Sequence, residues 1–94
     1  MSDTITEWTT GTTWSLRKHA IRPETSIRPE FYSGPPTAPA ACNQSYWLYI
    51  DNTDHKRLPD HIRRGRDSAK ACKRCETIVA RETGRTLAEI AGVR

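Results

Sequence analysis

The sequence predicts a small, mainly α-helical domain at residues 42–94, preceded by an extended arm at residues 1–41. Three observations lead to this fold class. An amphipathic pattern over about 68–82 is the clearest helical signal, and shorter helical signals lie on either side of it. The first 41 residues are rich in Thr and Pro and show no sustained apolar period. With 94 residues, the chain has room for one small domain with a modest core.

The predicted arm contains two kinds of signal. The tandem "IRPETSIRPE" at residues 21–30 and the stretch "SGPPTAPAA" favour extended, polyproline-like backbone, because Pro fixes its own backbone and restricts the residue before it. Aromatic residues in such an arm are expected to dock onto a partner or onto the domain that follows. The four aromatic residues concerned are Trp8, Trp14, Phe31 and Tyr32.

One short strand is predicted at residues 45–51, in "SYWLYID". Aromatic and β-branched residues favour the pleated surface of a sheet. Alternation would place Tyr46, Leu48 and Ile50 on one side, with Trp47 and Tyr49 on the other. A helix stays an alternative, because so short an apolar run has no decisive period.

The longest predicted helix runs from Ser68 to about Glu82, and Gly84 would supply a left-handed end. At about 100° per residue, its side chains separate into two faces. The inward stripe would consist of Ala71, Cys72, Cys75, Ile78 and Val79, and the outward face of Lys70, Lys73, Arg74, Thr77 and Arg81. The helix would therefore bury sulfur and present positive charge.

Two shorter helices are predicted beside it. In "LPDHIRRG", Pro59 would occupy the first turn and Gly65 the end. In "TLAE", Thr86 and Glu89 have the spacing of a capping box, and Gly92 would end that helix.

Composition and charge indicate where in the cell the chain is expected and which class of partner it is expected to bind. No apolar run approaches the roughly 20 residues that span a bilayer, and "MSDTITEW" lacks the features of a secretory signal. We therefore expect a cytoplasmic protein with reduced thiols and no membrane contact. Residues 1–54 carry four Lys/Arg against six Asp/Glu, whereas residues 55–94 carry eleven against five. This basic second half favours a nucleic acid or an acidic protein surface as partner.

The cysteines carry the most specific chemistry. Cys72 and Cys75 are spaced Cys-x-x-Cys, and Cys42 lies thirty residues before them. We set aside a redox pair, because Cys72 is expected about one turn inside a helix, with no strand leading directly into it. Two interpretations stay open: the thiols are small buried apolar groups, or they bind a metal with His55 or His61 as a fourth ligand. His19 lies in the predicted arm and is expected to be solvated.

The sequence also resembles the WhiB-like proteins of actinobacteria and their phages. The resemblance is carried by "AAC" at residues 40–42, the aromatic "YWLY" soon after it, and "DSAKACKRCETI" thirty residues on. It implies a mostly helical fold and an iron–sulfur cluster bound by cysteines, here Cys42, Cys72 and Cys75. It also implies a role in transcription through the primary sigma factor of RNA polymerase. The family's fourth cysteine position falls on Arg81.

The function predicted from the sequence is that of a transcription-associated regulatory binding protein, not an enzyme, with zinc, an iron–sulfur cluster or no metal. No phosphate-binding loop, nucleophile elbow or zinc-protease motif is present, and no small-molecule substrate is expected. The alternative is a metal-free interaction module, such as a phage-type host inhibitor or assembly component, that wraps a partner with its arm. The residues expected to contact DNA or an acidic protein surface are Arg63, Arg64, Arg66, Lys70, Lys73, Arg74 and Arg81.

Overall fold

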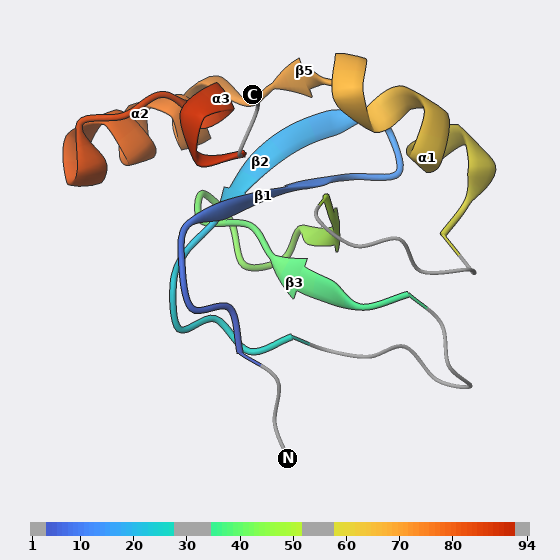
Figure 1. The fold of residues 1–94 in the computed structure, drawn as a ribbon, viewed down its shortest axis with the longest axis horizontal. Helices are drawn as coiled ribbons and strands as arrows, with labels where there is room; N and C mark the ends of the chain where they lie inside the picture. Colours follow the sequence, from blue (N-terminus) through green and yellow to red (C-terminus); the bar gives the residue numbers. More distant parts are fainter. Residues whose placement is uncertain (1–3, 28–34, 52–57, 92–94) are drawn as a thin grey trace.

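The computed structural model describes residues 4–27, 35–51 and 58–91 (Figure 1). Five strands, three α-helices and one short 3-10 helix follow one another along these segments. In chain order they are β1 (Thr9–Thr12), β2 (Arg17–Ile21), β3 (Thr37–Pro39), β4 (Trp47–Ile50), α1 (Asp60–Gly65), the 3-10 helix (Arg66–Ser68), β5 (Lys70–Ala71), α2 (Lys73–Thr83) and α3 (Leu87–Ile90).

A five-stranded mixed sheet organises the fold, so the prediction of a mainly α-helical domain is wrong. The strand order is β3-β4-β1-β2-β5. The β2–β5 pair is parallel and the other three pairs are antiparallel. Three of these strands lie in the segment that was expected to be an extended arm, and the β1–β2 hairpin occupies the middle of the sheet.

The arm prediction failed because a Thr-rich segment without an apolar period can still form strands. Thr10 and Thr12 are fully buried, and each donates its hydroxyl to Asp51 at 2.7 Å. Lys18 forms an ion pair with the same carboxylate at 3.1 Å. Threonine is β-branched and suits a strand, and here its hydroxyl has a buried acceptor, so a polar segment can form the centre of a sheet.

The long helix is shorter than predicted at its start. It begins at Lys73, five residues later than Ser68, and Cys72 is its N-cap in extended conformation. The residues before it are drawn into strand β5, where Lys70 pairs with Arg17 of β2. The end is as predicted, because Gly84 adopts a left-handed φ of 71°.

The shorter elements lie where they were predicted, although β4 is shorter than the predicted strand and Gly92 lies outside the described residues. Strand β4 buries Leu48 and Ile50, and α1 follows Pro59 and ends at Gly65. Helix α3 has both hydrogen bonds of a capping box between Thr86 and Glu89. Local signals that need no distant partner were therefore reliable.

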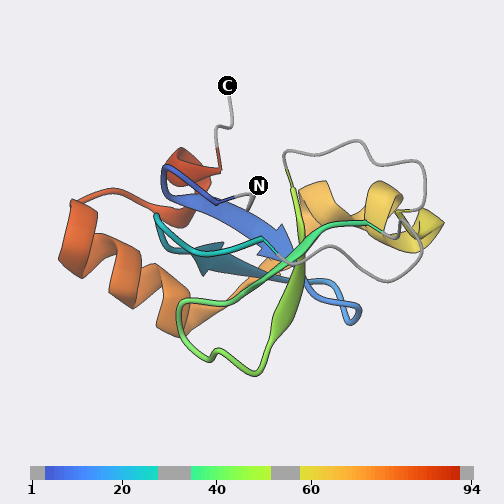
Figure 2. The same cartoon turned by 90° about the horizontal axis from the view of Figure 1, so that it is seen from below.

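Two hydrophobic clusters use opposite faces of β2, because neighbouring strand residues point to opposite sides. Ile21 belongs to the first cluster with Ile5, Leu48 and Ile50, whereas Ala20 belongs to the second with α2 and α3. Helices α2 and α1 lie at opposite ends of the longest axis of the molecule (Figures 1 and 2).

Candidate metal centre

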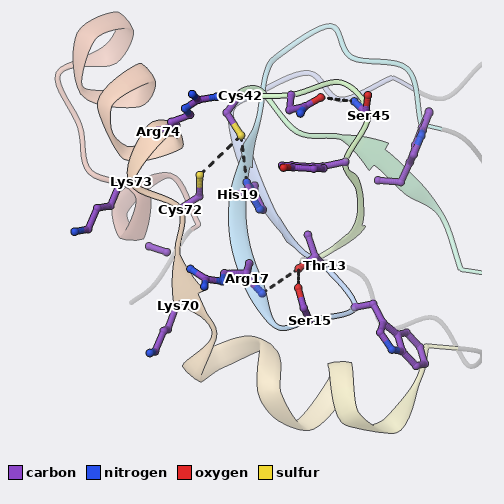
Figure 3. A pocket seen from close by; sticks show the side chains of 15 residues that line it. Thr13, Ser15, Arg17, His19, Cys42, Ser45, Lys70, Cys72, Lys73 and Arg74 are labelled. Carbon is purple, nitrogen blue, oxygen red and sulfur yellow. Dashed lines mark hydrogen bonds between the residues drawn. The ribbon is translucent and has the colours of Figure 1, made fainter.

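Four possible metal ligands meet at the junction of β2, α2 and the loop after β3. His19 comes from β2, Cys42 from the loop between β3 and β4, Cys72 from the N-cap of α2 and Cys75 from its first turn. One ligand atom from each residue lies within 4.8 Å of all the others. Figure 3 shows His19, Cys42 and Cys72 directed toward one another.

Backbone hydrogen bonds to β2 hold the cysteine segments in place. The Ala41 N–H donates to the Ala20 carbonyl at 2.8 Å, which fastens the loop that carries Cys42. The Cys72 N–H donates to the Lys18 carbonyl at 2.8 Å, which continues the β2–β5 pairing to the start of α2. Strand β2 therefore fixes the segments that carry Cys42 and Cys72, and it also supplies the imidazole of His19.

Three of the distances between ligand atoms are close to those around one tetrahedral ion, and all of them are within 4.8 Å. Zinc bonds of about 2.3 Å to sulfur and about 2.0 Å to nitrogen place neighbouring ligand atoms roughly 3.5–3.8 Å apart. The Sγ atoms of Cys42 and Cys72 are 3.8 Å apart. The Nδ1 atom of His19 lies 3.4 Å from the Cys42 sulfur and 3.6 Å from the Cys75 sulfur.

The acid–base properties of the four groups differ. Burial, with a smaller contribution from the Arg17 guanidinium, lowers the pKa of His19, so the ring is held neutral as a ligand must be. Burial and contacts with the two other thiols raise the pKa of Cys42 to about 12. Burial also raises the pKa of Cys75.

Cys72 is the thiol that ionises most readily. Burial acts to raise its pKa, but hydrogen bonds from the Cys75 backbone, the Cys42 thiol and the Arg74 backbone outweigh it, so the pKa lies below the ordinary value. A thiolate at a helix N-terminus is stabilised by the unpaired N–H groups there. This geometry, with strand β5 leading straight into Cys72, contradicts our reason for setting a redox pair aside.

His19 was the residue that the sequence analysis missed. It was expected to be solvated in a flexible arm, but it is 5% exposed within β2. A possible signal was the β-branched run before it, since a hairpin at Thr9–Ile21 would have buried alternate residues. Of the two histidines predicted as the fourth ligand, His61 does not join the cluster, because its Nε2 lies 3.0 Å from the Trp14 carbonyl oxygen. His55 lies outside the described residues.

The predicted basic residues separate into different parts of the surface. Arg63 and Arg64 belong to α1 and Arg66 to the 3-10 helix, at the end of the molecule away from α2. Lys70, Lys73 and Arg74 lie beside the metal centre on β5 and the start of α2 (Figure 3). Arg81 is exposed further along α2 and lines a second hollow together with Cys42, Lys73 and Arg74.

An open groove of about 970 Å³ passes over the metal centre. Its cationic residues are Arg17, Lys70, Lys73 and Arg74, and its aromatic residues are Trp14, Tyr46 and Trp47. None of its lining residues is an Asp or Glu. Of the predicted docking aromatics, Trp14 is therefore in the groove, whereas Trp8 packs against the second cluster under Arg22, and Phe31 and Tyr32 lie outside the described residues.

Comparisons with known proteins assign no family to this chain: no protein-family model, curated protein or solved structure matches it. Within the described segments, no helix is both long enough and apolar enough to cross a membrane. The chemistry of the centre thus has to be argued from its own residues. What the structure establishes is that His19, Cys42, Cys72 and Cys75 lie close enough to bind one metal ion.

Proposed function

We propose that the chain is a small binding protein whose fold is stabilised by one structural zinc ion held by His19, Cys42, Cys72 and Cys75. The observation that carries this proposal is the distance of at most 4.8 Å between any two of the four ligand atoms. Three thiols and one imidazole are a common ligand set of structural zinc. These ligands come from β2, a loop and α2, so the ion would join segments that are far apart in the sequence.

A single ion fits these atoms better than an iron–sulfur cluster does. In a cluster the cysteines bind different irons, and the irons and sulfides stand between them. Ligand atoms then lie farther apart than around one ion, whereas two of the sulfurs here are only 3.8 Å apart. The relationship to WhiB-like proteins remains a prediction, and zinc is our proposal for this chain.

The ion would have a structural role rather than a catalytic one. Catalytic zinc keeps a coordination position for water or substrate, whereas four protein ligands close the tetrahedron. The proposed ion would therefore have no open position for water or substrate, and that the chain is not an enzyme stays a prediction.

The partner we propose is negatively charged, and a role in transcription stays part of this proposal. Support comes from the exposed cations beside the centre on β5 and α2. The alternative of an arm that wraps a partner is not retained, because β1 and β2 are built into the sheet.

Metal analysis of the purified chain tests the proposal, with two histidine variants as a matched pair. We expect one zinc per chain, loss of zinc in His19→Ala, and full zinc content in His61→Ala, whose ring contacts Trp14 instead. Zinc content that is absent from the native chain, or that depends on His61 and not on His19, contradicts the proposal.

A further inference from the structure

We infer that the groove over the metal centre binds single-stranded nucleic acid, with unpaired bases stacked on its exposed aromatic rings and phosphates on its cations. This inference rests on the proposed zinc-stabilised fold, and it names the class of partner. The three large apolar side chains that stay exposed in the described segments are Trp14, Tyr46 and Trp47. All three line this one groove.

The degree of exposure of these rings is the first argument. Trp14 is 64% exposed, Tyr46 47% and Trp47 42%. In a chain this small, with a modest core, leaving such rings in water forgoes much of the stabilisation that burial would give. Their grouping along one groove indicates that they contact a flat apolar ligand.

The rings are also positioned by the fold. Trp14 lies in the β1–β2 turn, where its ring meets His61 edge-on at 4.1 Å between centroids, and the same histidine contacts its carbonyl. Tyr46 precedes β4 and lies 5.5 Å from the His19 ring. Contacts with His61 and His19 therefore hold the rings of Trp14 and Tyr46 beside the groove.

Charge is the second argument. The groove contains Arg17, Lys70, Lys73 and Arg74 without an acidic residue. Within the described segments none of these four forms an ion pair, whereas Lys18 and Arg22 pair with Asp51 and Glu82. A zinc ion with three thiolates carries one net negative charge, which the four cations outweigh.

Stacking distinguishes a single strand from a duplex. Bases in a duplex are stacked on one another and their faces are not accessible, whereas unpaired bases stack readily on aromatic side chains. The aromatic residues and the cations line the same groove, and Figure 3 shows Lys70, Lys73 and Arg74 along the β5 and α2 side. Cations that contact the phosphate backbone, together with aromatic rings on which the bases stack, are typical of single-strand binding.

The test is a titration of zinc-loaded protein with a labelled oligothymidylate of about ten nucleotides, beside a duplex of equal length and an acidic peptide. We expect the single strand to bind more tightly than either. Tyr46→Ala should weaken binding about tenfold, because stacking contributes roughly 1–3 kcal/mol per base. Lys70→Ala should reduce the slope of log affinity against log salt by about 0.7, the contribution of one phosphate contact.

Arg85→Ala is the matched control, since it removes one exposed cation from the segment between α2 and α3, outside the groove, and should leave both affinity and slope unchanged. Equal binding of duplex and single strand, an unchanged affinity in Tyr46→Ala, or a preference for the acidic peptide would each overturn the inference. Zinc content is measured in every variant. A chain that holds zinc but does not bind the single strand refutes this inference alone, whereas a chain without zinc refutes the proposed function.

Discussion

The two hydrophobic clusters of this chain differ in what holds them together. The first cluster contains the branched aliphatic residues Ile5, Ile21, Leu48 and Ile50, which pack on one side of the sheet. The second cluster joins α2 and α3 to the other side, and its centre includes Ala20 and the ligand Cys75. The second cluster also contains Val79, Leu87 and Ile90. Because one of its members is a proposed ligand, we expect the proposed metal to stabilise this cluster more than the first.

Cys42 connects the two clusters, because it packs against both. A metal bound there would tie the helices to a sheet that is already held by aliphatic packing and by the Thr–Asp51 hydrogen bonds. If the proposed ion binds, this small chain combines an ordinary apolar core with a core that an ion completes. The predictions below separate these two kinds of stabilisation.

The largest effect is expected for Cys75→Ser, which removes a fully buried ligand. Structural zinc supplies roughly 10 kcal/mol or more of folding free energy in zinc-finger peptides, so loss of one ligand should unfold the helical end. Hydrogen exchange should show the amides of α2 and α3 losing their protection, while those of β1 and β4 retain theirs. Protection of α2 at the native level in this variant would contradict the comparison.

Acidification should act on the same end of the molecule. Because the pKa of His19 is lowered in the folded chain, the unfolded chain takes up protons first as the pH falls. The stabilisation is therefore complete above the ordinary histidine pKa of about 6.5 and is lost below it. Acid would also protonate the thiolates and release the proposed ion, which again lowers the stability as the pH falls. Thermal unfolding followed from pH 8 to about pH 5 should show this loss, and a profile that rises toward acid pH would refute it.

Leu48→Ala tests the other cluster. Leu48 is fully buried, and truncation of such a residue costs about 2–5 kcal/mol. Urea unfolding should report this loss, with zinc content unchanged under conditions where the variant is folded. A variant that lost its zinc while still folded would show that the two clusters are not separable.

Gly11 allows strands β1 and β4 to lie close to each other. A Cβ atom at that position would lie 2.6 Å from the Cβ of Leu48 and 3.0 Å from the Tyr49 carbonyl oxygen. Glycine therefore permits the close approach of β1 and β4 that brings the aliphatic side chains together.

The smallest effect is expected for Thr86→Ala at the start of α3. The hydroxyl of Thr86 accepts from the Glu89 N–H at 3.1 Å, and loss of such a cap costs about 1 kcal/mol. Native-state hydrogen exchange should show a local increase in α3 and no change in zinc content. Thr86→Ser keeps the acceptor and should restore the exchange rate; failure to do so would contradict the capping explanation.

The sequence allowed prediction of those features that local chemistry determines. Pro59 and Gly65 marked α1, Gly84 marked the end of α2, and the capping box marked α3. The three cysteines were also recognised as residues that could share a metal. In each case, the type of residue carried the information, at a single position or at a few positions.

The rest depended on contacts between distant segments. The strand nature of Thr9–Thr12 follows from hydrogen bonds to Asp51, about forty residues away along the chain. Pairing of Lys70 with Arg17 converted a predicted helical turn into β5 and moved the helix start to Lys73. Because both errors concerned β2 and its neighbours, His19 was assigned to solvent and was left out of the predicted ligand set.

The central claim is that one tetrahedral ion is bound by three sulfurs and the imidazole of His19. X-ray absorption at the metal edge of the purified protein measures this directly. We expect zinc with three sulfur neighbours at about 2.3 Å and one nitrogen neighbour at about 2.0 Å. A spectrum of iron with sulfide bridges, or of zinc without sulfur neighbours, would contradict the account.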